Sequence, residues 1–272
     1  MNQSLANKLV LCDLDNLLLG PDGNLTQVVR DVLQLFSSRG GRFTVFSQRT
    51  PKAVRALLGS VRLSAPALVC GGTLAYHFAD GSRQPLCSFA GQDAGLFASL
   101  PSAAGVGIAL QMQDGSTRVL RMSHALEQHL QQEWTPYLLA NAADIRPDEV
   151  YQDNRSIPLT SLLEKALGGS TTALLGERAA PDLLRLTPRT VSGAEMLQAV
   201  CTPVGIAPEN VLVLAGSMPM LELVRAASRS AAAADAPAEL RLAAKQVTLT
   251  DAAGGAAVEV LYRMVRAAEK SV

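Results

Sequence analysis

Short apolar runs alternate with amphipathic stretches over the first seventy residues of the chain. The run Leu9–Cys12 predicts a buried strand, and Arg42–Phe46 and Ala67–Cys70 predict two more. Between them, apolar positions at helical spacing predict helices over Thr26–Ser38 and Thr50–Gly59, each opened by a threonine that can cap it. Strands that alternate with helices in this way predict a parallel sheet with right-handed crossovers.

The pattern changes from about residue 73. Leu74–Phe89 predicts a hairpin with Asp80-Gly81 at its turn. Residues 90–185 mix strand-like and helix-like pieces, which favours an inserted α+β domain. Its predicted strands are Gly107–Met112, Val119–Met122, Thr171–Leu175 and Leu183–Leu186, and its predicted helices are Leu126–Trp134 and Leu159–Leu167.

The alternating pattern returns after Thr187-Pro188. Ala231–Ala234 fits either a short buried strand or the start of a helix. The other predicted elements are helices at Val191–Val204, Met218–Ala227, residues 237–244 and Gly254–Glu269, and strands at Val211–Ala215 and Gln246–Thr250. The chain is therefore expected to be an α/β protein, with a core domain of residues 1–82 and 188–272 and an inserted α+β cap domain of residues 83–187.

Composition narrows the function classes. The 272 residues carry 24 Lys+Arg and 24 Asp+Glu, so the net charge is zero and no basic stripe suggests nucleic acid. No apolar window is long enough for a membrane span, and no apolar signal segment precedes the first strand. The four cysteines lack metal-site spacing and fit buried thiols in a reducing compartment. We expect a soluble, cytoplasmic protein with no nucleic-acid or membrane partner.

The candidate chemistry lies where the first strand ends, at Asp13 and Asp15. Ligands bind at the carboxyl edge of open parallel sheets. Two acids one residue apart there suit a nucleophile beside an acid/base, or a Mg²⁺ site built from oxygen ligands. The same residues also fit an Asp-rich turn that has no catalytic role.

These acids, together with an α+β insertion after the third strand, resemble the haloacid dehalogenase (HAD) superfamily, and within it the Cof-type sugar-phosphate phosphatases. The segments Val69–Thr73, Gly205–Val211 and Gln246–Gly255 also resemble stretches of that family. The resemblance implies a Rossmann-like HAD core, a parallel sheet flanked by helices, with an inserted α+β cap domain.

Two of the family's four motifs are retained in part. The D-x-D-G-T motif implies that Asp13 is the nucleophile that forms an aspartyl-phosphate and that Asp15 is the general acid/base. Its Gly-Thr is replaced here by Asn16-Leu17. Ser47 matches the second motif, a hydroxyl that binds the phosphoryl group.

The other two motifs are altered. The family's lysine is missing from Val191–Ala194, and Arg189 is the nearest cation and the second predicted phosphate-binding residue. Gly216 and Met220 replace the two metal-binding acids of the fourth motif, and Glu222 is the only acid nearby. The resemblance thus implies a Mg²⁺ ion held weakly, by Asp13 and the backbone carbonyl of Asp15.

Two hypotheses stay open. In the first, the chain is a catalytically weakened or inactive HAD-like homologue, a pseudophosphatase that binds a small phosphorylated molecule or a protein partner. In the second, it is a divergent Mg²⁺-dependent phosphomonoesterase of the sugar-phosphate type. The missing lysine and metal acids favour the first, and the retention of Asp13, Asp15 and Ser47 in register favours the second.

Overall fold

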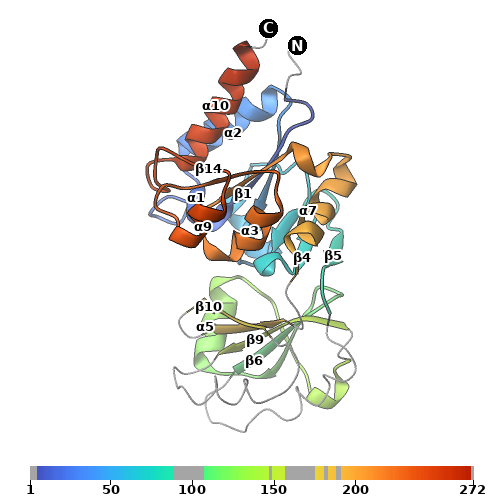
Figure 1. Ribbon diagram of the computed structural model, residues 1–272. Coiled ribbons are helices and arrows are strands. Elements are labelled where there is room, and N and C mark those ends of the chain that lie inside the picture. The colour runs from blue at the N-terminus through green and yellow to red at the C-terminus, as the bar shows by residue number, and fades with distance from the viewer. Residues whose placement is uncertain are drawn as a thin grey trace. The chain divides into compact units, whose positions relative to one another are not determined.

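The computed structural model describes residues 5–88, 107–146, 149–156, 175–180, 183–187 and 191–270. The chain divides into two compact units (Figure 1). The first consists of Met1–Gln84 with Ser192–Val272, and the second of Pro85–Val191.

The first unit is built on an eight-stranded sheet of order β14-β13-β12-β1-β2-β3-β4-β5. Its strands are β1 (Leu9–Asp13), β2 (Arg42–Phe46), β3 (Ala67–Val69), β4 (Leu74–Tyr76), β5 (Arg83–Pro85), β12 (Val211–Ala215), β13 (Arg229–Ala232) and β14 (Gln246–Val247). The strands from β14 to β3 are parallel, and β4 is antiparallel to β3. β1 lies between β12 and β2, and all five of its residues are buried. Its carboxyl end is therefore fixed from both sides.

Helices flank this sheet (Figure 1). They are α1 (Leu14–Leu17), α2 (Gln27–Ser38), α3 (Pro51–Leu58), α7 (Gly193–Cys201), α8 (Leu221–Ala226), α9 (Ala238–Ala243) and α10 (Ala256–Lys270), with 3-10 turns η1 (Cys70–Gly72), η5 (Thr202–Val204), η6 (Pro208–Asn210) and η7 (Met218–Met220). Thr26 and Thr50 cap α2 and α3 as predicted, since each hydroxyl accepts a hydrogen bond from a backbone N–H of the first turn. α2 packs against α10, and α7 packs against α8.

The second unit contains a six-stranded sheet of order β10-β11-β9-β6-β7-β8. Its elements are β6 (Gly107–Met112), β7 (Thr117–Arg121), α5 (His124–Gln132), β8 (Leu138–Leu139), η3 (Ala142–Asp144), β9 (Val150–Ser156), β10 (Leu175–Ala180) and β11 (Leu183–Thr187). Leu126 and Leu130 of α5 pack with Ala109 and Val119 of the sheet. This small apolar cluster joins helix and sheet into an α+β unit.

The predicted α/β class is confirmed, with a parallel-rich sheet flanked by helices and an α+β insertion. Of the two alternatives for Ala231–Ala234, a strand or the start of a helix, the structure shows a strand, β13, which ends at Ala232. The predicted helix Met218–Ala227 is wrong in its first turn, which is the 3-10 turn η7 around Pro219. The predicted strand Gln246–Thr250 is shorter, because Thr248 turns to accept a hydrogen bond from the backbone N–H of Ala234.

Three expectations fall wholly or partly outside the described residues: helix Leu159–Leu167, most of strand Thr171–Leu175, and Phe89 at the end of the predicted hairpin. Strands β8 and β9 are not among the predicted elements. Among the described residues, no helix combines the length and apolar character that a membrane crossing requires.

Candidate functional site

Asp13 is the last residue of β1 and the N-cap of α1. Its Oδ1 accepts a hydrogen bond from the backbone N–H of Asn16 (3.1 Å), which satisfies one of the free donors at the start of the helix. Asp13 is only 1 % exposed. The strand thus places the Asp13 carboxylate at the edge of the sheet, where the first turn of α1 donates a hydrogen bond to it.

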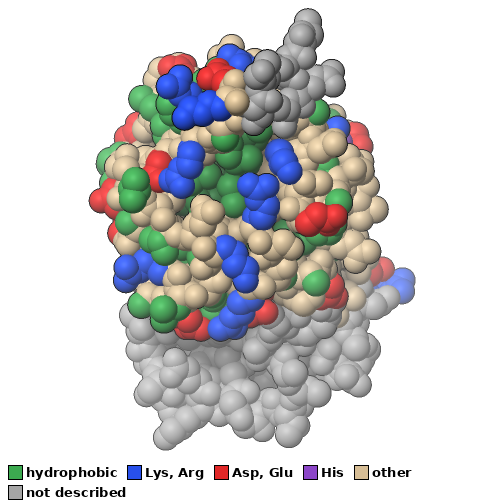
Figure 2. Space-filling view, turned by 45° about the horizontal axis from the view of Figure 1, so that its top comes forward, with side chains coloured by type: hydrophobic (Ala, Val, Ile, Leu, Met, Phe, Trp, Pro, Cys, Tyr) green, Lys and Arg blue, Asp and Glu red, His purple; other side chains and the backbone are tan. Residues whose placement is uncertain are grey.

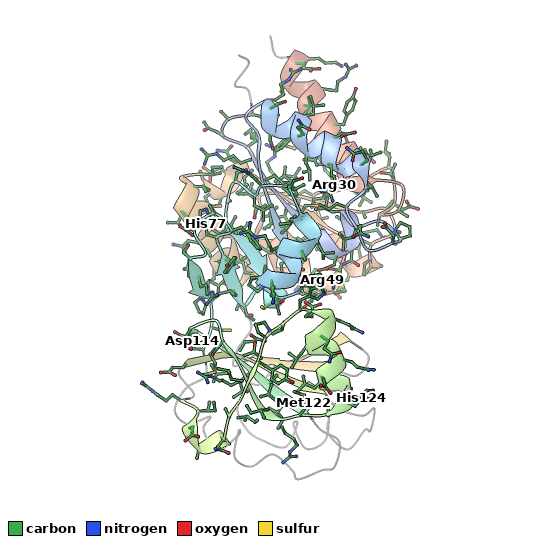
Figure 3. The ribbon with its side chains drawn as sticks, turned by 180° about the vertical axis from the view of Figure 1, so that it is seen from behind. Arg30, Arg49, His77, Asp114, Met122 and His124 are labelled. Carbon is green, nitrogen blue, oxygen red and sulfur yellow. The ribbon has the colours of Figure 1, made fainter. Side chains whose placement is uncertain are left out.

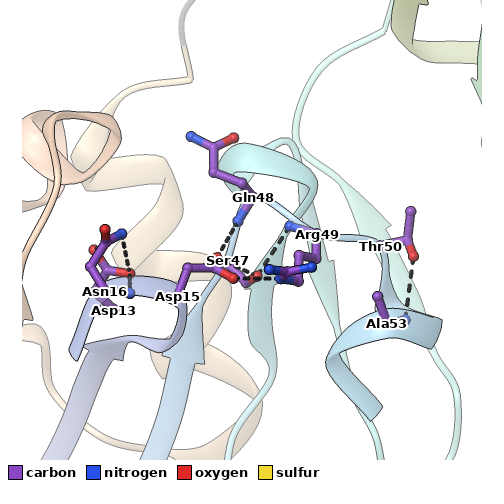
Figure 4. Close-up of polar contacts among 8 residues, drawn as sticks. All are labelled: Asp13, Asp15, Asn16, Ser47, Gln48, Arg49, Thr50 and Ala53. Atoms are coloured by element: carbon purple, nitrogen blue, oxygen red, sulfur yellow. Dashed lines mark hydrogen bonds and ion pairs between the residues drawn. The ribbon is translucent and has the colours of Figure 1, made fainter. Parts of the chain in front are cut away.

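Side chains of Asn16 and Ser217 complete the surroundings of this carboxylate. The Asn16 amide donates to both Oδ1 (3.2 Å) and Oδ2 (3.1 Å) of Asp13 (Figure 4). The Ser217 hydroxyl donates to Oδ2 (2.6 Å). A carboxylate has about four lone-pair positions, and four donor contacts converge on this one. Burial raises the pKa of Asp13, and the hydrogen bonds from Ser217 and Asn16 oppose that rise.

Asp15 is also fully engaged, with neighbours from the loop after β2. Its Oδ2 accepts from the Ser47 hydroxyl (2.7 Å) and the Gln48 backbone N–H (3.1 Å), and its Oδ1 accepts from Nε of Arg49 (2.7 Å) (Figure 4). The Asp15 side chain is 17 % exposed and that of Arg49 is 38 % exposed, so the acid is the more buried member of this ion pair. In all three contacts the Asp15 carboxylate acts as the acceptor.

The loop after β3 holds the loop that carries Ser47. Backbone N–H groups of Gly71 and Cys70 donate to the carbonyls of Ser47 (3.1 Å) and Arg49 (2.9 Å). Cys70, Gly71 and Gly72 all have φ between +52° and +84°, a region that favours glycine. The two loops therefore form one rigid edge, in which the buried Ser47 faces Asp15.

Gly216, where the family places its first metal-binding acid, lies directly against Asn16 and Leu17. A Cβ at Gly216 would be 2.9 Å from both Asn16 Cβ and Leu17 Cδ2. Carbon atoms do not approach that closely without displacement. Met220, at the second acidic position, is fully buried in the apolar core. The glycine in the fourth motif thus makes space for Asn16 and Leu17, the two altered residues of the first motif.

Gly193, where the family's lysine would stand, is a packing contact between α7 and α8. A Cβ there would be 1.9 Å from the carbonyl oxygen of Glu222 and 2.8 Å from Ala226 Cβ. No side chain fits at residue 193 unless the two helices separate. The carboxylate of Glu222 forms an ion pair with Arg225 (3.0 Å), and both side chains are exposed on the surface of α8.

A Mg²⁺ ion does not fit the described residues. Among the residues that the structure describes, no three acids, histidines or cysteines gather as a metal site would require. Asp13 is surrounded by hydrogen-bond donors, and donors repel a cation. Asp15 points to Arg49. Mg²⁺ prefers oxygen ligands in octahedral geometry, and all four carboxylate oxygens of Asp13 and Asp15 already accept hydrogen bonds, which leaves the Asp15 backbone carbonyl of the predicted ligand set.

The structure therefore brings together Asp13, Asp15 and Ser47, three of the four predicted catalytic and phosphate-binding residues. Arg189 lies outside the described residues. Sequence reasoning missed three partners: Asn16, Arg49 and Ser217. Asn16 and Arg49 stand beside motif residues in the sequence, but nothing in their spacing shows that their side chains turn onto the two acids.

Solved structures of HAD phosphatases are similar to this chain. A HAD superfamily phosphatase from Bacteroides thetaiotaomicron is 17 % identical, with a TM-score of 0.74 over 94 % of each chain. A haloacid dehalogenase-like hydrolase from the same organism is 17 % identical, with a TM-score of 0.76 over 94 % of this chain and 99 % of that one. A sugar phosphatase of HAD subclass IIB is 14 % identical, with a TM-score of 0.76 over 94 % and 98 %.

No family model matches the chain, and no curated protein matches it. The similarity to solved structures extends over almost the whole chain at low identity, and it shows the fold. The chain has the fold of the HAD superfamily phosphatases, a Rossmann-like core with an α+β insertion.

Proposed function

We propose that this chain is a catalytically weakened or inactive HAD-like phosphatase, which acts by binding a small phosphorylated molecule or a protein partner. One observation carries the proposal: four hydrogen-bond contacts from Asn16 and Ser217 occupy the two oxygens of Asp13. A nucleophilic carboxylate needs an accessible oxygen for attack. Here both oxygens are used as acceptors in a buried cap.

Asp15 supports the same conclusion. A general acid must hold a proton that it can give to the leaving group. Asp15 instead accepts hydrogen bonds from Ser47 and Gln48 and pairs with Arg49. In these contacts both carboxylate oxygens act as acceptors, whereas a general acid donates from one of them.

The two cations that the family uses, a lysine and Mg²⁺, lack their usual positions as well. Phosphoryl transfer depends on cations that stabilise charge in the transition state. Gly193 has no space for the family's lysine, and Gly216 has none for an aspartate. We therefore propose that Mg²⁺, the cofactor implied by the resemblance, binds weakly if at all.

The alternative is a divergent Mg²⁺-dependent phosphomonoesterase that forms an aspartyl-phosphate on Asp13. The retained placement of Asp13, Asp15 and Ser47 at one sheet edge favours it. It would require the Asn16 amide to leave the carboxylate during turnover.

Phosphate release distinguishes the two. The full chain is incubated with p-nitrophenyl phosphate and a panel of sugar phosphates, with and without Mg²⁺, beside Asp13→Asn. We expect wild type and variant to release phosphate at the same background rate. Mg²⁺-dependent release that disappears in Asp13→Asn would instead show a working phosphatase.

A binding measurement completes the test. Titration of a hexose 6-phosphate into wild type and Ser47→Ala tests whether the retained edge holds a phosphoryl group. Weaker binding to the variant is the expected result for a small-molecule ligand. Equal, negligible binding would reject the sugar phosphate and leave a protein partner as the proposed class.

A further inference from the structure

A cavity lies in the first unit, and Asp13 is not among the residues that line it. It has a volume of about 280 Å³ and is open to solvent between α2 and the segment after α3. Arg30 and Arg62 line it, with Ser37 and Ser60 as further polar groups and Leu33 and Phe43 as apolar ones. Figure 3 labels Arg30 well apart from Arg49, the residue that pairs with Asp15.

The walls of this cavity are fixed by regular structure. Arg30, Leu33 and Ser37 follow one another at helical spacing, so they share one face of α2. The opposite wall is held to β2 by Ser64, whose hydroxyl accepts from the backbone N–H of Phe43 (3.0 Å) and whose N–H donates to the Phe43 carbonyl (2.9 Å). The cavity is therefore preformed and does not depend on a ligand.

Its charge is positive and is not neutralised from within. No acidic residue lines it. Within the described residues, Arg62 has no ion-pair partner, and Arg30 makes a single long hydrogen bond (3.4 Å) to the carbonyl of Leu58. Guanidinium groups in such a position are available to a carboxylate or phosphate, which they bind with two parallel hydrogen bonds.

The surrounding sheet edge adds to this potential. Basic residues stand at or just before the amino ends of four parallel strands: Lys8, Arg42, Arg229 and Lys245. Lys8 and Arg42 bond to neutral groups, the Asn210 amide oxygen and the Val204 carbonyl, so their charges are not cancelled. Figure 2 shows Lys and Arg side chains around a hollow whose floor is hydrophobic. Basic residues thus outnumber acids at these strand starts, where Glu209 just before β12 is the acid.

We propose that the cavity binds a small organic anion, a phosphate ester or carboxylate attached to an apolar group. The anion would lie between Arg30 and Arg62, and the apolar group against Leu33 and Phe43, which are almost fully buried. The volume lies at the lower end of the range for ligand pockets, so the ligand is small. This inference is independent of the proposed function, because it shares no residue with the Asp13 edge.

Calorimetric titration tests it with three probes: phenyl phosphate, benzoate and benzyl alcohol. We expect one or both anions to bind wild type, and the neutral alcohol not to bind. Arg30→Gln/Arg62→Gln should weaken binding about tenfold or more, since charged hydrogen bonds are lost. Arg62→Gln alone alters only an exposed side chain, so it tests the charge even if the double variant folds poorly. Arg30→Lys/Arg62→Lys should restore part of the affinity.

The matched control is Arg241→Gln, an exposed arginine of α9 that does not line the cavity. It should leave the affinity unchanged. Three results would overturn the inference: no anion binds wild type, benzyl alcohol binds as well as the anions, or binding is lost in Ser47→Ala but kept in the double arginine variant. The last would place the anion at the Asp13 edge.

Discussion

Asn16 changes the chemistry of the site more than any other single residue. In the family motif the corresponding position is glycine, which has no side chain to reach the nucleophile. Here the amide contacts both oxygens of Asp13, and the backbone N–H of the same residue makes a third contact. The side chain at this one position therefore adds two of the four hydrogen-bond contacts that surround the Asp13 carboxylate.

The first prediction follows from the environment of Asp13. Burial raises the pKa of its carboxyl, so the folded protein holds the charged form less well than the unfolded chain does. Asp13→Asn removes that charge and should therefore raise Tm at neutral pH. The gain should shrink as pH falls through the raised pKa, and it should vanish below about pH 4, where Asp13 is protonated in both states. Thermal unfolding across this pH range measures it.

Asp22→Asn is the control for that experiment. The pKa of Asp22 is lowered, because the backbone and side chain of Asn24 donate hydrogen bonds to it. Asp22→Asn should therefore give no gain at neutral pH. If Asp13→Asn lowers Tm instead, the hydrogen bonds that the buried carboxylate accepts outweigh the cost of burying its charge.

At the scale of elements, the strands that build the site could be predicted from the sequence. β1, β2 and β12 are apolar runs bounded by polar residues, and that pattern alone indicates buried parallel strands. The position of Asp13 and Ser47 at one edge follows from parallel topology. The contacts of Asn16 and Arg49 could not be predicted, because they depend on side-chain direction in two loops.

The role of Gly193 was equally hidden in the sequence. A glycine at a helix start commonly reflects local turn geometry, and no pattern shows which other helix comes near. The structure places it against the Glu222 carbonyl of α8, an element nearly thirty residues away in the chain. The close packing of α7 and α8 thus requires glycine at residue 193 and leaves no space there for a lysine.

Gly193→Ala tests this requirement. The added methyl would overlap a backbone carbonyl, so α7 and α8 must separate, and we expect a loss of about 3 kcal/mol or more in the free energy of unfolding. Gly205→Ala is the control, since a Cβ there meets no atom within 4 Å although φ is +63°. Denaturant unfolding should show a clearly smaller loss for the control. Equal losses would mean that α7 and α8 accommodate the added methyl group, and the packing requirement at Gly193 would then be wrong.

Gly216→Asp tests whether the first and fourth motifs changed together. Alone, the aspartate should destabilise the protein by about 1–3 kcal/mol, because its Cβ overlaps Asn16 and Leu17 and its charge lies near Asp13. Combined with Asn16→Gly and Leu17→Thr, the steric part of that loss should disappear. Thermal unfolding of the single, double and triple variants gives the coupling between the positions. Strict additivity would show that the changes are independent.

At the scale of the whole molecule, the departures from the family's motifs lie in several elements, and each is matched by the packing around it. Asp13 is capped from α1, Gly216 packs on the same turn, and Gly193 closes the contact between α7 and α8. A site in decay would leave holes or unpaired groups. Here Gly193 and Gly216 are closely packed against neighbouring residues and both retained acids have hydrogen-bond partners, an arrangement that supports the proposed binding role.

Metal binding gives a test of that view on the intact chain. A ligand present at a hundred times its Kd stabilises a protein by ~2.7 kcal/mol, which would raise Tm by about 5–10 °C. We expect no such rise when millimolar MgCl₂ replaces NaCl at equal ionic strength, because the oxygens of Asp13 accept hydrogen bonds and Asp15 is paired with Arg49. The triple variant Asn16→Gly/Leu17→Thr/Gly216→Asp is the positive comparison, since it supplies a second carboxylate and removes the Asn16 amide from the two oxygens of Asp13. A Mg²⁺-dependent rise in wild type, absent in Asp13→Asn, would show that the Asn16 amide gives way to a cation and would favour the phosphatase hypothesis.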